Sequence, residues 1–309
     1  MSLVTLNPVV ARDKFFTAPF SIQHALSDHS MFELSQLVSL AQSMPRDKVE
    51  FNSGKLAPGT KPEDVPQIDM PVADIIRHIE DTNAWMVLKN VEQVPEYRQI
   101  LKSFLDDAAR QAGVDPSLFS DLQGFIFISS ANSVTPFHID AEENILIQIK
   151  GDKYIHIFDN QDRTLISECD MELSPSKHRN QYYESGFEQR ATIYTMKESD
   201  GVRLPYMWPH WVRTGDRYSI SMAMTWKTPE VLKLNKIRLM NGTLRRFGLP
   251  QSAPGVSPMR DAAKVVLHDA IGLVINPIRK SETMRKLLRG AIYGRAANYY
   301  YGASKRQPT

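Results

Sequence analysis

The sequence predicts an antiparallel β-sandwich or barrel between two mostly helical regions. Between Leu122 and Trp226, short runs rich in β-branched and aromatic residues, such as GFIFISS, NILIQIK and YSISMAMTW, alternate with polar turns. On either side of these runs, apolar residues recur at helical spacing instead. We therefore expect a mixed, mostly helical region over residues 1–115, a β region over 116–228 and a helical region over 229–309.

The helices before the β region are expected from their end signals as well as from periodicity. In SDHSMFELSQLVSLAQSMP, Ser30 and Glu33 are spaced as a capping box and Pro45 follows the last apolar position. In PEYRQILKSFLDDAARQAG, Pro95 opens and Gly113 closes a stripe of apolar residues at helical spacing. The run AWMVLKNV lies between these helices and predicts a short buried strand, so this region is mixed rather than wholly helical.

The composition describes a globular chain of 309 residues, of which 42% are hydrophobic and 23% charged. Cys169 is the only cysteine, so no disulfide can form within the chain. The N-terminus also lacks the basic start and long apolar run of a secretory signal, and we expect a cytoplasmic location. No apolar run reaches the roughly eighteen residues that a membrane span needs, so no span is expected.

The net charge of +2 hides a strong asymmetry along the chain. From Thr228 to Thr309 there are fifteen lysines and arginines against four acids, and the rest of the chain carries the opposite excess. This basic tail suits nucleic acid, an anionic membrane surface or a partner subunit. It also carries two apolar stripes at helical spacing: Ala262, Val265, Val266, Ala270, Leu273 and Val274, then Met284, Leu287, Leu288, Ala291 and Ile292. Because such stripes need burial, we favour a homodimer over a nucleic-acid role.

Candidate metal ligands come from two places in the β region. His138 and Asp140 are two residues apart at the mouth of an expected β-hairpin, so on a strand their side chains share one face. His210 follows the aromatic and proline-rich run LPYMWP and precedes the last β run. Two histidines and one carboxylate form the facial triad of non-haem Fe(II), which leaves three coordination positions open. For the first pair alone, the alternative is a surface histidine held by a neighbouring carboxylate.

Lys153 and Thr135 extend this candidate site. Lys153 follows the expected turn KGDK and shares a strand face with Ile155 and Ile157. A lysine among apolar residues inside a barrel is costly unless it meets an anion. Thr135 lies three residues before His138 and offers a hydroxyl to the same anion. The alternative for Lys153 is a solvated lysine at a turn.

The run TPFHIDAEENILIQIKGDK resembles the JmjC-type cupin oxygenases, and within that family the asparaginyl hydroxylases most closely. The resemblance covers about residues 116–228. It implies a double-stranded β-helix, the cupin or jelly-roll fold, that uses Fe(II), 2-oxoglutarate and O2 to hydroxylate a side chain of a protein or peptide substrate. The implied site residues are the metal ligands His138, Asp140 and His210, the pair Thr135 and Lys153 for the distal carboxylate of 2-oxoglutarate, and Asn144 as an active-site asparagine.

Two positions depart from the family pattern. Met224 stands two residues before Trp226, where the asparaginyl hydroxylases have an asparagine near the metal. Glu142 stands where they have an uncharged amide that contacts the peptide substrate. We therefore expect the fold and cofactors to be shared more closely than the substrate.

Other polar and aromatic residues of the β region have simpler interpretations. His156 is expected on the strand face opposite Lys153 as a packing histidine, and His178 in a solvated loop. Trp208 and Trp211 flank His210 and are expected to wall the mouth of the barrel. Two functional alternatives stay open, which are a non-catalytic cupin module that binds a metal or a small acid, and an RNA-directed oxygenase of the same chemistry.

Overall fold

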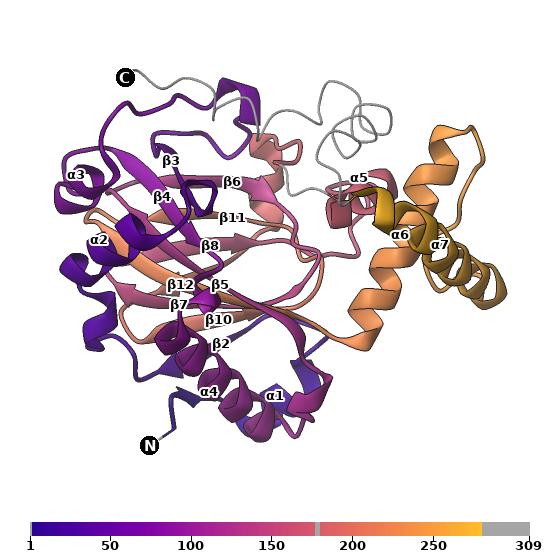
Figure 1. Cartoon of the computed structure of the whole chain (residues 1–309), viewed down its shortest axis with the longest axis horizontal. Helices are drawn as coiled ribbons and strands as arrows, with labels where there is room; N and C mark the ends of the chain where they lie inside the picture. The colour runs from indigo at the N-terminus through magenta and orange to yellow at the C-terminus, as the bar shows by residue number, and fades with distance from the viewer. Residues whose placement is uncertain (1, 177–179, 280–309) are drawn as a thin grey trace.

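The computed structural model describes residues 2–176 and 180–279, in which two antiparallel β-sheets face each other (Figure 1). The larger sheet has the strand order β1-β2-β10-β7-β12-β5-β4-β3, and the smaller sheet has the order β6-β11-β8-β9. The strands are β1 (Val4–Thr5), β2 (Phe20–His24), β3 (Val49–Ser53), β4 (Ala84–Lys89), β5 (Ser120–Ser129), β6 (Val134–His138), β7 (Glu143–Lys150), β8 (Lys153–Ile157), β9 (Thr192–Met196), β10 (Asp200–Leu204), β11 (His210–Thr214) and β12 (Ser219–Lys227). This arrangement confirms a jelly-roll core flanked by helices.

Helices cover the outer face of the larger sheet and extend the chain beyond it (Figure 1). They are α1 (Pro8–Lys14), α2 (Leu34–Ser43), α3 (Val72–Arg77), α4 (Pro95–Ala112), α5 (Glu168–Leu173), α6 (Pro229–Arg246) and α7 (Pro258–Arg279). Helix α4 ends at Gly113, whose φ of 72° is the left-handed conformation expected of a C-terminal glycine. The capping box expected at Ser30 and Glu33 is wrong. Ser30 opens a short 3-10 turn capped by His29, and Glu33 caps α2 without a side-chain hydrogen bond.

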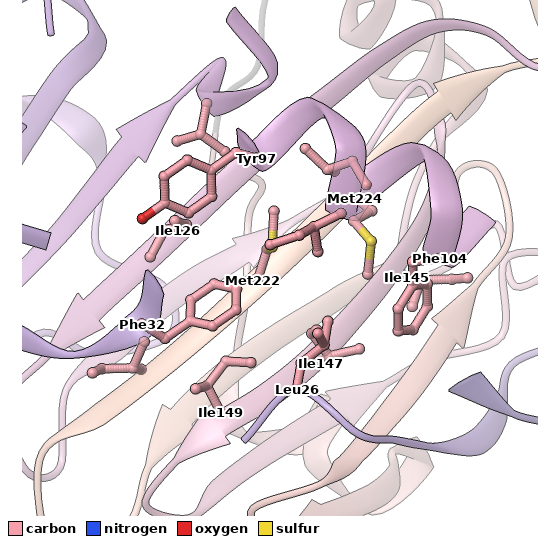
Figure 2. Packing of buried hydrophobic residues seen from close by; sticks show 14 of the residues in the cluster. Leu26, Phe32, Tyr97, Phe104, Ile126, Ile145, Ile147, Ile149, Met222 and Met224 are labelled. Atoms are coloured by element: carbon pink, nitrogen blue, oxygen red, sulfur yellow. The ribbon is translucent and has the colours of Figure 1, made fainter. Parts of the chain in front are cut away.

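The main hydrophobic core lies between the larger sheet and its helices. Figure 2 shows Tyr97 and Phe104 of α4 packed near Met222 and Met224 of β12. Both methionines are fully buried, because alternate side chains of β12 point outward to this core. The intervening residues of β12 therefore point inward, to the space between the two sheets.

The larger sheet contains strands from both sides of the boundary expected at residue 115. Strands β1 to β4 come from the N-terminal region, where β2 pairs with β10 and β4 pairs with β5. The run FSIQH in β2 alternates between buried and exposed residues, which is the strand period. Local periodicity identifies a strand but not its partner, so the sequence did not show that these strands belong to the same sheet.

The hairpin expected around His138 is wrong in its pairing. Strand β6 lies in the smaller sheet and pairs with β11, whereas β7 lies in the larger sheet between β10 and β12. The next turn, Lys150–Lys153, also crosses from one sheet to the other, since β8 pairs with β11 and β9. Residues that are close in sequence therefore reach the space between the sheets from opposite sides.

Helices α6 and α7 lie beside the sheets, and α6 packs on both α5 and α7 (Figure 1). Lys236 of α6 and Asp269 of α7 form an ion pair at 2.8 Å. Among the described residues, no helix is both long and apolar enough to span a membrane. The second apolar stripe expected in the tail, from Met284 to Ile292, lies outside the described residues, as does His178.

Candidate active site

A cavity of about 380 Å³ lies between the two sheets. Strands β4, β5, β7 and β12 form its wall on the larger sheet, and β6, β8 and β11 form its wall on the smaller sheet. All six residues that the sequence singled out as site residues line it: Thr135, His138, Asp140, Asn144, Lys153 and His210. The jelly-roll connection brings them together, because it places their strands on both walls.

The three predicted metal ligands converge at one end of this cavity. His138 ends β6 and pairs across the smaller sheet with His210, which begins β11. Asp140 lies just beyond the end of β6, and its two oxygens are 3.9 Å from His138 Nε2 and 3.8 Å from His210 Nε2. Two atoms that each bind one metal at about 2.1 Å lie at most about 4.2 Å apart, so these separations suit a shared ion. The three side chains form a group that could hold a metal ion.

Backbone hydrogen bonds fix which ring nitrogen carries the proton in both histidines. His138 Nδ1 lies 2.7 Å from the carbonyl oxygen of Pro136, and His210 Nδ1 lies 2.9 Å from that of Trp208. A carbonyl oxygen only accepts hydrogen bonds, so each Nδ1 carries the proton and donates it. Each Nε2 therefore turns its lone pair toward Asp140, as a metal ligand must.

Lys153 is buried at the start of β8, with 4% of its surface exposed. Its ammonium donates a hydrogen bond to Ser221 Oγ and lies 5.7 Å from the centre of the Phe127 ring. Among the described residues, no carboxylate forms an ion pair with it. Loss of hydration on burial lowers the pKa of Lys153 to about 7. The interpretation as a solvated turn lysine is therefore wrong, and the cavity holds a cation whose partners are a hydroxyl and an aromatic ring.

Neighbouring side chains fix the orientation of Thr135 and Asn144. The indole of Trp85 donates a hydrogen bond to Thr135 Oγ1 at 2.9 Å, which leaves the hydroxyl proton of Thr135 available to an acceptor in the cavity. Asn144 Nδ2 donates to Asp140 Oδ2 at 3.2 Å, so Asn144 supports the metal ligand directly. Its oxygen, Oδ1, has no partner among the described residues.

Met224, which stands where the resemblance has an asparagine near the metal, does not line the cavity. Met224 lies in the outer core, and its neighbour Thr225 lines the cavity instead. Thr225 pairs across the sheet with Asn144, and its buried hydroxyl also lacks a partner among the described residues. The alternation of side chains along YSISMAMTW could have predicted this. It places Met222 and Met224 on one face of the strand and Thr225 on the other face, toward the cavity.

Glu142 lines the cavity as the sequence led us to expect, close to the metal ligands. Burial and the nearby charge of Asp140 raise the pKa of Glu142 to about 7. Lys227 opposes this shift from 3.9 Å, but the same ammonium lies 3.4 Å from Asp121. A cation bound at Asp140 would remove the repulsion and favour the ionised form of Glu142.

The remaining residues near the site have structural roles. The ring of His156 stacks on Trp211 at 3.7 Å, and its Nδ1 contacts Glu188, so His156 is a packing residue as predicted. Neither Trp208 nor Trp211 lines the cavity, and the mouth walls expected from them are wrong. Arg203, which the sequence did not suggest, is fully buried and donates to the backbone oxygen of Asn144 at 3.0 Å.

Two facing antiparallel sheets with a two-histidine-one-carboxylate group between them define a jelly-roll protein of the cupin class with a candidate metal centre. A family model described as the cupin-like domain matches residues 15–230, and the chain belongs to this family. The match begins well before residue 116, in agreement with the N-terminal strands of the larger sheet.

A solved structure of an Escherichia coli protein shows the same fold. The X-ray structure of ycfD has 13% sequence identity and a TM-score of 0.50, and the match covers 94% of this chain and 72% of that one. A structure of YcfD described as a ribosomal oxygenase with cobalt and 2-oxoglutarate has 16% identity and a TM-score of 0.49, over 89% and 68% of the two chains. No curated protein matches the sequence significantly. The finer likeness to asparaginyl hydroxylases stays a prediction.

Proposed function

We propose that this protein is an Fe(II)- and 2-oxoglutarate-dependent oxygenase that hydroxylates a side chain of a protein or peptide substrate. The observation that carries the proposal is the presence of Lys153 in the same cavity as the candidate metal ligands. A buried ammonium without a carboxylate partner is expensive, and it suits an anionic ligand that arrives with the metal. A 2-oxo acid with a second carboxylate would bind the metal through its 2-oxo acid end and Lys153 through its second carboxylate.

Each residue has a defined part in this proposal. His138, Asp140 and His210 would hold Fe(II), which supplies the activation of O2 when bound. Lys153 and Thr135 would bind the distal carboxylate of 2-oxoglutarate and so direct its 2-oxo acid end to the metal. In the overall reaction, a substrate C–H bond, O2 and 2-oxoglutarate give a C–OH group, succinate and CO2.

The two alternatives predict different products. A non-catalytic cupin module would bind the metal or a small acid without forming succinate. An RNA-directed oxygenase would form succinate in response to RNA rather than to peptide. The combination of the candidate metal ligands with Lys153 and Thr135 favours turnover over binding alone, because a module that holds only a metal or only a small acid does not need both features together.

The direct test is anaerobic titration with Fe(II) and then 2-oxoglutarate, followed by O2 and a succinate assay. We expect one Fe(II) per chain and a charge-transfer absorption band when 2-oxoglutarate binds. His138→Ala, Asp140→Ala and His210→Ala should each abolish Fe(II) binding, whereas His78→Ala, at an exposed position, should keep it. Full metal affinity in any of the three ligand variants would show that the triad is misassigned. Binding of Fe(II) and 2-oxoglutarate without formation of succinate would favour the non-catalytic cupin module.

A further inference from the structure

Two of the three candidate metal ligands depend for their placement on connections between strands. Asp140 lies in the connection 139–142 between β6 and β7, and His210 directly follows the connection 205–209 between β10 and β11. A connection lacks the ladder of backbone hydrogen bonds that fixes a strand, so its position depends on the contacts made by its own residues. The 3.8 Å between Asp140 Oδ2 and His210 Nε2 therefore depends on what joins the two connections.

Asn235 of helix α6 joins these connections. Its Nδ2 donates a hydrogen bond to the backbone oxygen of Ala141 at 2.9 Å, and its Oδ1 accepts one from the hydroxyl of Tyr206 at 2.8 Å. Ala141 directly follows Asp140, and Tyr206 lies four residues before His210. Both polar groups of one amide are used, so a single side chain reaches from one connection to the other.

A backbone hydrogen bond joins the same connections beside this amide. The N–H of Met207 donates to the backbone oxygen of Asp140 at 3.0 Å. Met207 is buried and has a φ of 61°, a left-handed conformation that is unfavourable for a residue with a Cβ atom. Such a backbone persists where neighbouring contacts hold it, and the residue next to it, Tyr206, is held by Asn235. Asn235 thus supports the link between Asp140 and the connection that leads to His210.

The position of Asn235 in its helix is costly for packing alone. Asn235 is 9% exposed and lies on the buried face of α6 with Val231 and Arg238. A buried amide destabilises the fold unless its groups are hydrogen-bonded, and asparagine favours caps and turns over the interior of a helix. An apolar side chain would serve packing better. Joining two connections instead needs one donor and one acceptor on the same side chain, as an amide provides.

We infer that Asn235 is a positioning residue of the metal centre, which holds Asp140 and His210 at the separation that a shared ion requires. The inference rests on the proposed function, since it adds a residue to the metal centre of the same oxygenase. The match to the cupin-like domain ends at residue 230, so Asn235 lies beyond it. The metal centre then includes helix α6 as well as the two sheets.

The test uses Co(II), whose visible absorption bands report the geometry of its ligands, in titrations of the full-length protein. Asn235→Leu removes the donor and the acceptor with little change in size, and Tyr206→Phe removes only the hydroxyl. We expect Co(II) affinity to fall about 10–100-fold in Asn235→Leu, as is typical when the support of a metal ligand is lost. The loss should be smaller in Tyr206→Phe, which keeps the hydrogen bond to Ala141. The bands of bound Co(II) should shift in both variants, because Asp140 moves relative to His210.

Asn241→Leu is the matched control. Asn241 is a fully buried amide on the same helix, and its Nδ2 donates to the backbone oxygen of Ser252 at 3.0 Å rather than to either connection. Urea denaturation measures the stability of all three variants. We expect Asn241→Leu to be less stable than the wild-type protein but to bind Co(II) with the same affinity and the same bands.

The outcomes separate this inference from the proposed function. If the wild-type protein binds no Co(II), the proposed function fails and the inference fails with it. If the wild-type protein binds Co(II) but Asn235→Leu and Tyr206→Phe keep its affinity and bands, only the inference is overturned. An equal loss of affinity in Asn241→Leu would also overturn it, because the effect would then follow from lower stability alone. If Asn235→Leu does not fold, Tyr206→Phe decides: shifted bands support the inference, and unchanged bands overturn it.

Discussion

At the scale of single residues, Lys153 shows how a functional group can destabilise the fold that holds it. Its ammonium is buried away from water, where its contacts are the hydroxyl of Ser221 and the ring of Phe127. A buried charge without a carboxylate partner lowers the stability of the folded state, and a bound anion restores what was lost. This balance gives two predictions about the same side chain.

Replacement of Lys153 by methionine should stabilise the ligand-free protein while removing 2-oxoglutarate binding. The buried charge disappears and the apolar side chain fits among Ile155 and Ile157, so we expect a gain of about 1–4 kcal/mol in the free energy of unfolding. Urea denaturation and an anaerobic 2-oxoglutarate titration measure the two effects. Lys150→Met, at an exposed position in the same turn, should change neither. A loss of stability in Lys153→Met would mean that the ammonium is well compensated.

The lowered pKa of Lys153 also predicts how pH acts. In the unfolded chain the amine has its ordinary pKa of 10.5, and in the ligand-free fold it has a pKa of about 7. The unfolded state therefore binds more protons between these values, so the stability of the ligand-free protein should rise as pH increases from 7 toward 10. Because the anion needs the ammonium, 2-oxoglutarate affinity should fall over the same range. Calorimetric titration at several pH values checks this, and an affinity independent of pH would contradict it.

At the scale of elements, the turn between β7 and β8 decides where Lys153 lies. Gly151 has a φ of 71°, and its backbone N–H donates to Glu198 Oε1 at 3.0 Å. A Cβ atom at this position would lie 2.3 Å from the carbonyl oxygen of Tyr218. The turn carries the chain from the larger sheet to the smaller one, so its geometry sets the register of β8 against β11.

We predict that Gly151→Ala costs about 1–3 kcal/mol of stability, because it combines a left-handed backbone with a backbone clash. It should also weaken 2-oxoglutarate binding, since the start of β8 must move. Thermal denaturation with and without 2-oxoglutarate measures both. Gly186→Ala is the control, because nothing lies within 4 Å of an added Cβ there. Equal melting temperatures for the two variants would mean that the turn adapts easily.

At the scale of the whole molecule, helix α7 presents its apolar side outward. Asp261 and Lys264 are buried toward the rest of the structure, whereas the exposed side is apolar: Met259, Val266, Leu267, Ile271 and Leu273. The surrounding tail is basic and the rest of the chain is acidic. A continuous apolar face of this kind favours contact with another protein surface.

We propose that α7 forms the contact of a homodimer, as the apolar stripe of the tail led us to expect. Light scattering coupled to size exclusion should give twice the mass of one chain at both low and high salt. Val266→Glu with Leu273→Glu should give monomers, since charge would be buried in the contact. Lys233→Glu, on an exposed position of α6, should leave the mass unchanged. A wild-type monomer that binds RNA or DNA in a salt-sensitive way would instead favour the nucleic-acid role of the tail.

The sequence by itself determined part of the elements and predicted the chemistry of the site. Short β-rich runs predicted β4, β5, β7, β8, β9 and β12 but not β1 to β3 or β10. Residue types at short spacing predicted the ligands His138 and Asp140, because a strand places alternate residues on one face. The tertiary structure alone decided which strands are partners, since pairing depends on contacts between residues far apart in the chain. For that reason the expected hairpin after His138 was wrong, and the N-terminal strands were not assigned to the larger sheet. The same pairing decided that Thr225, rather than Met224, faces the cavity beside Asn144.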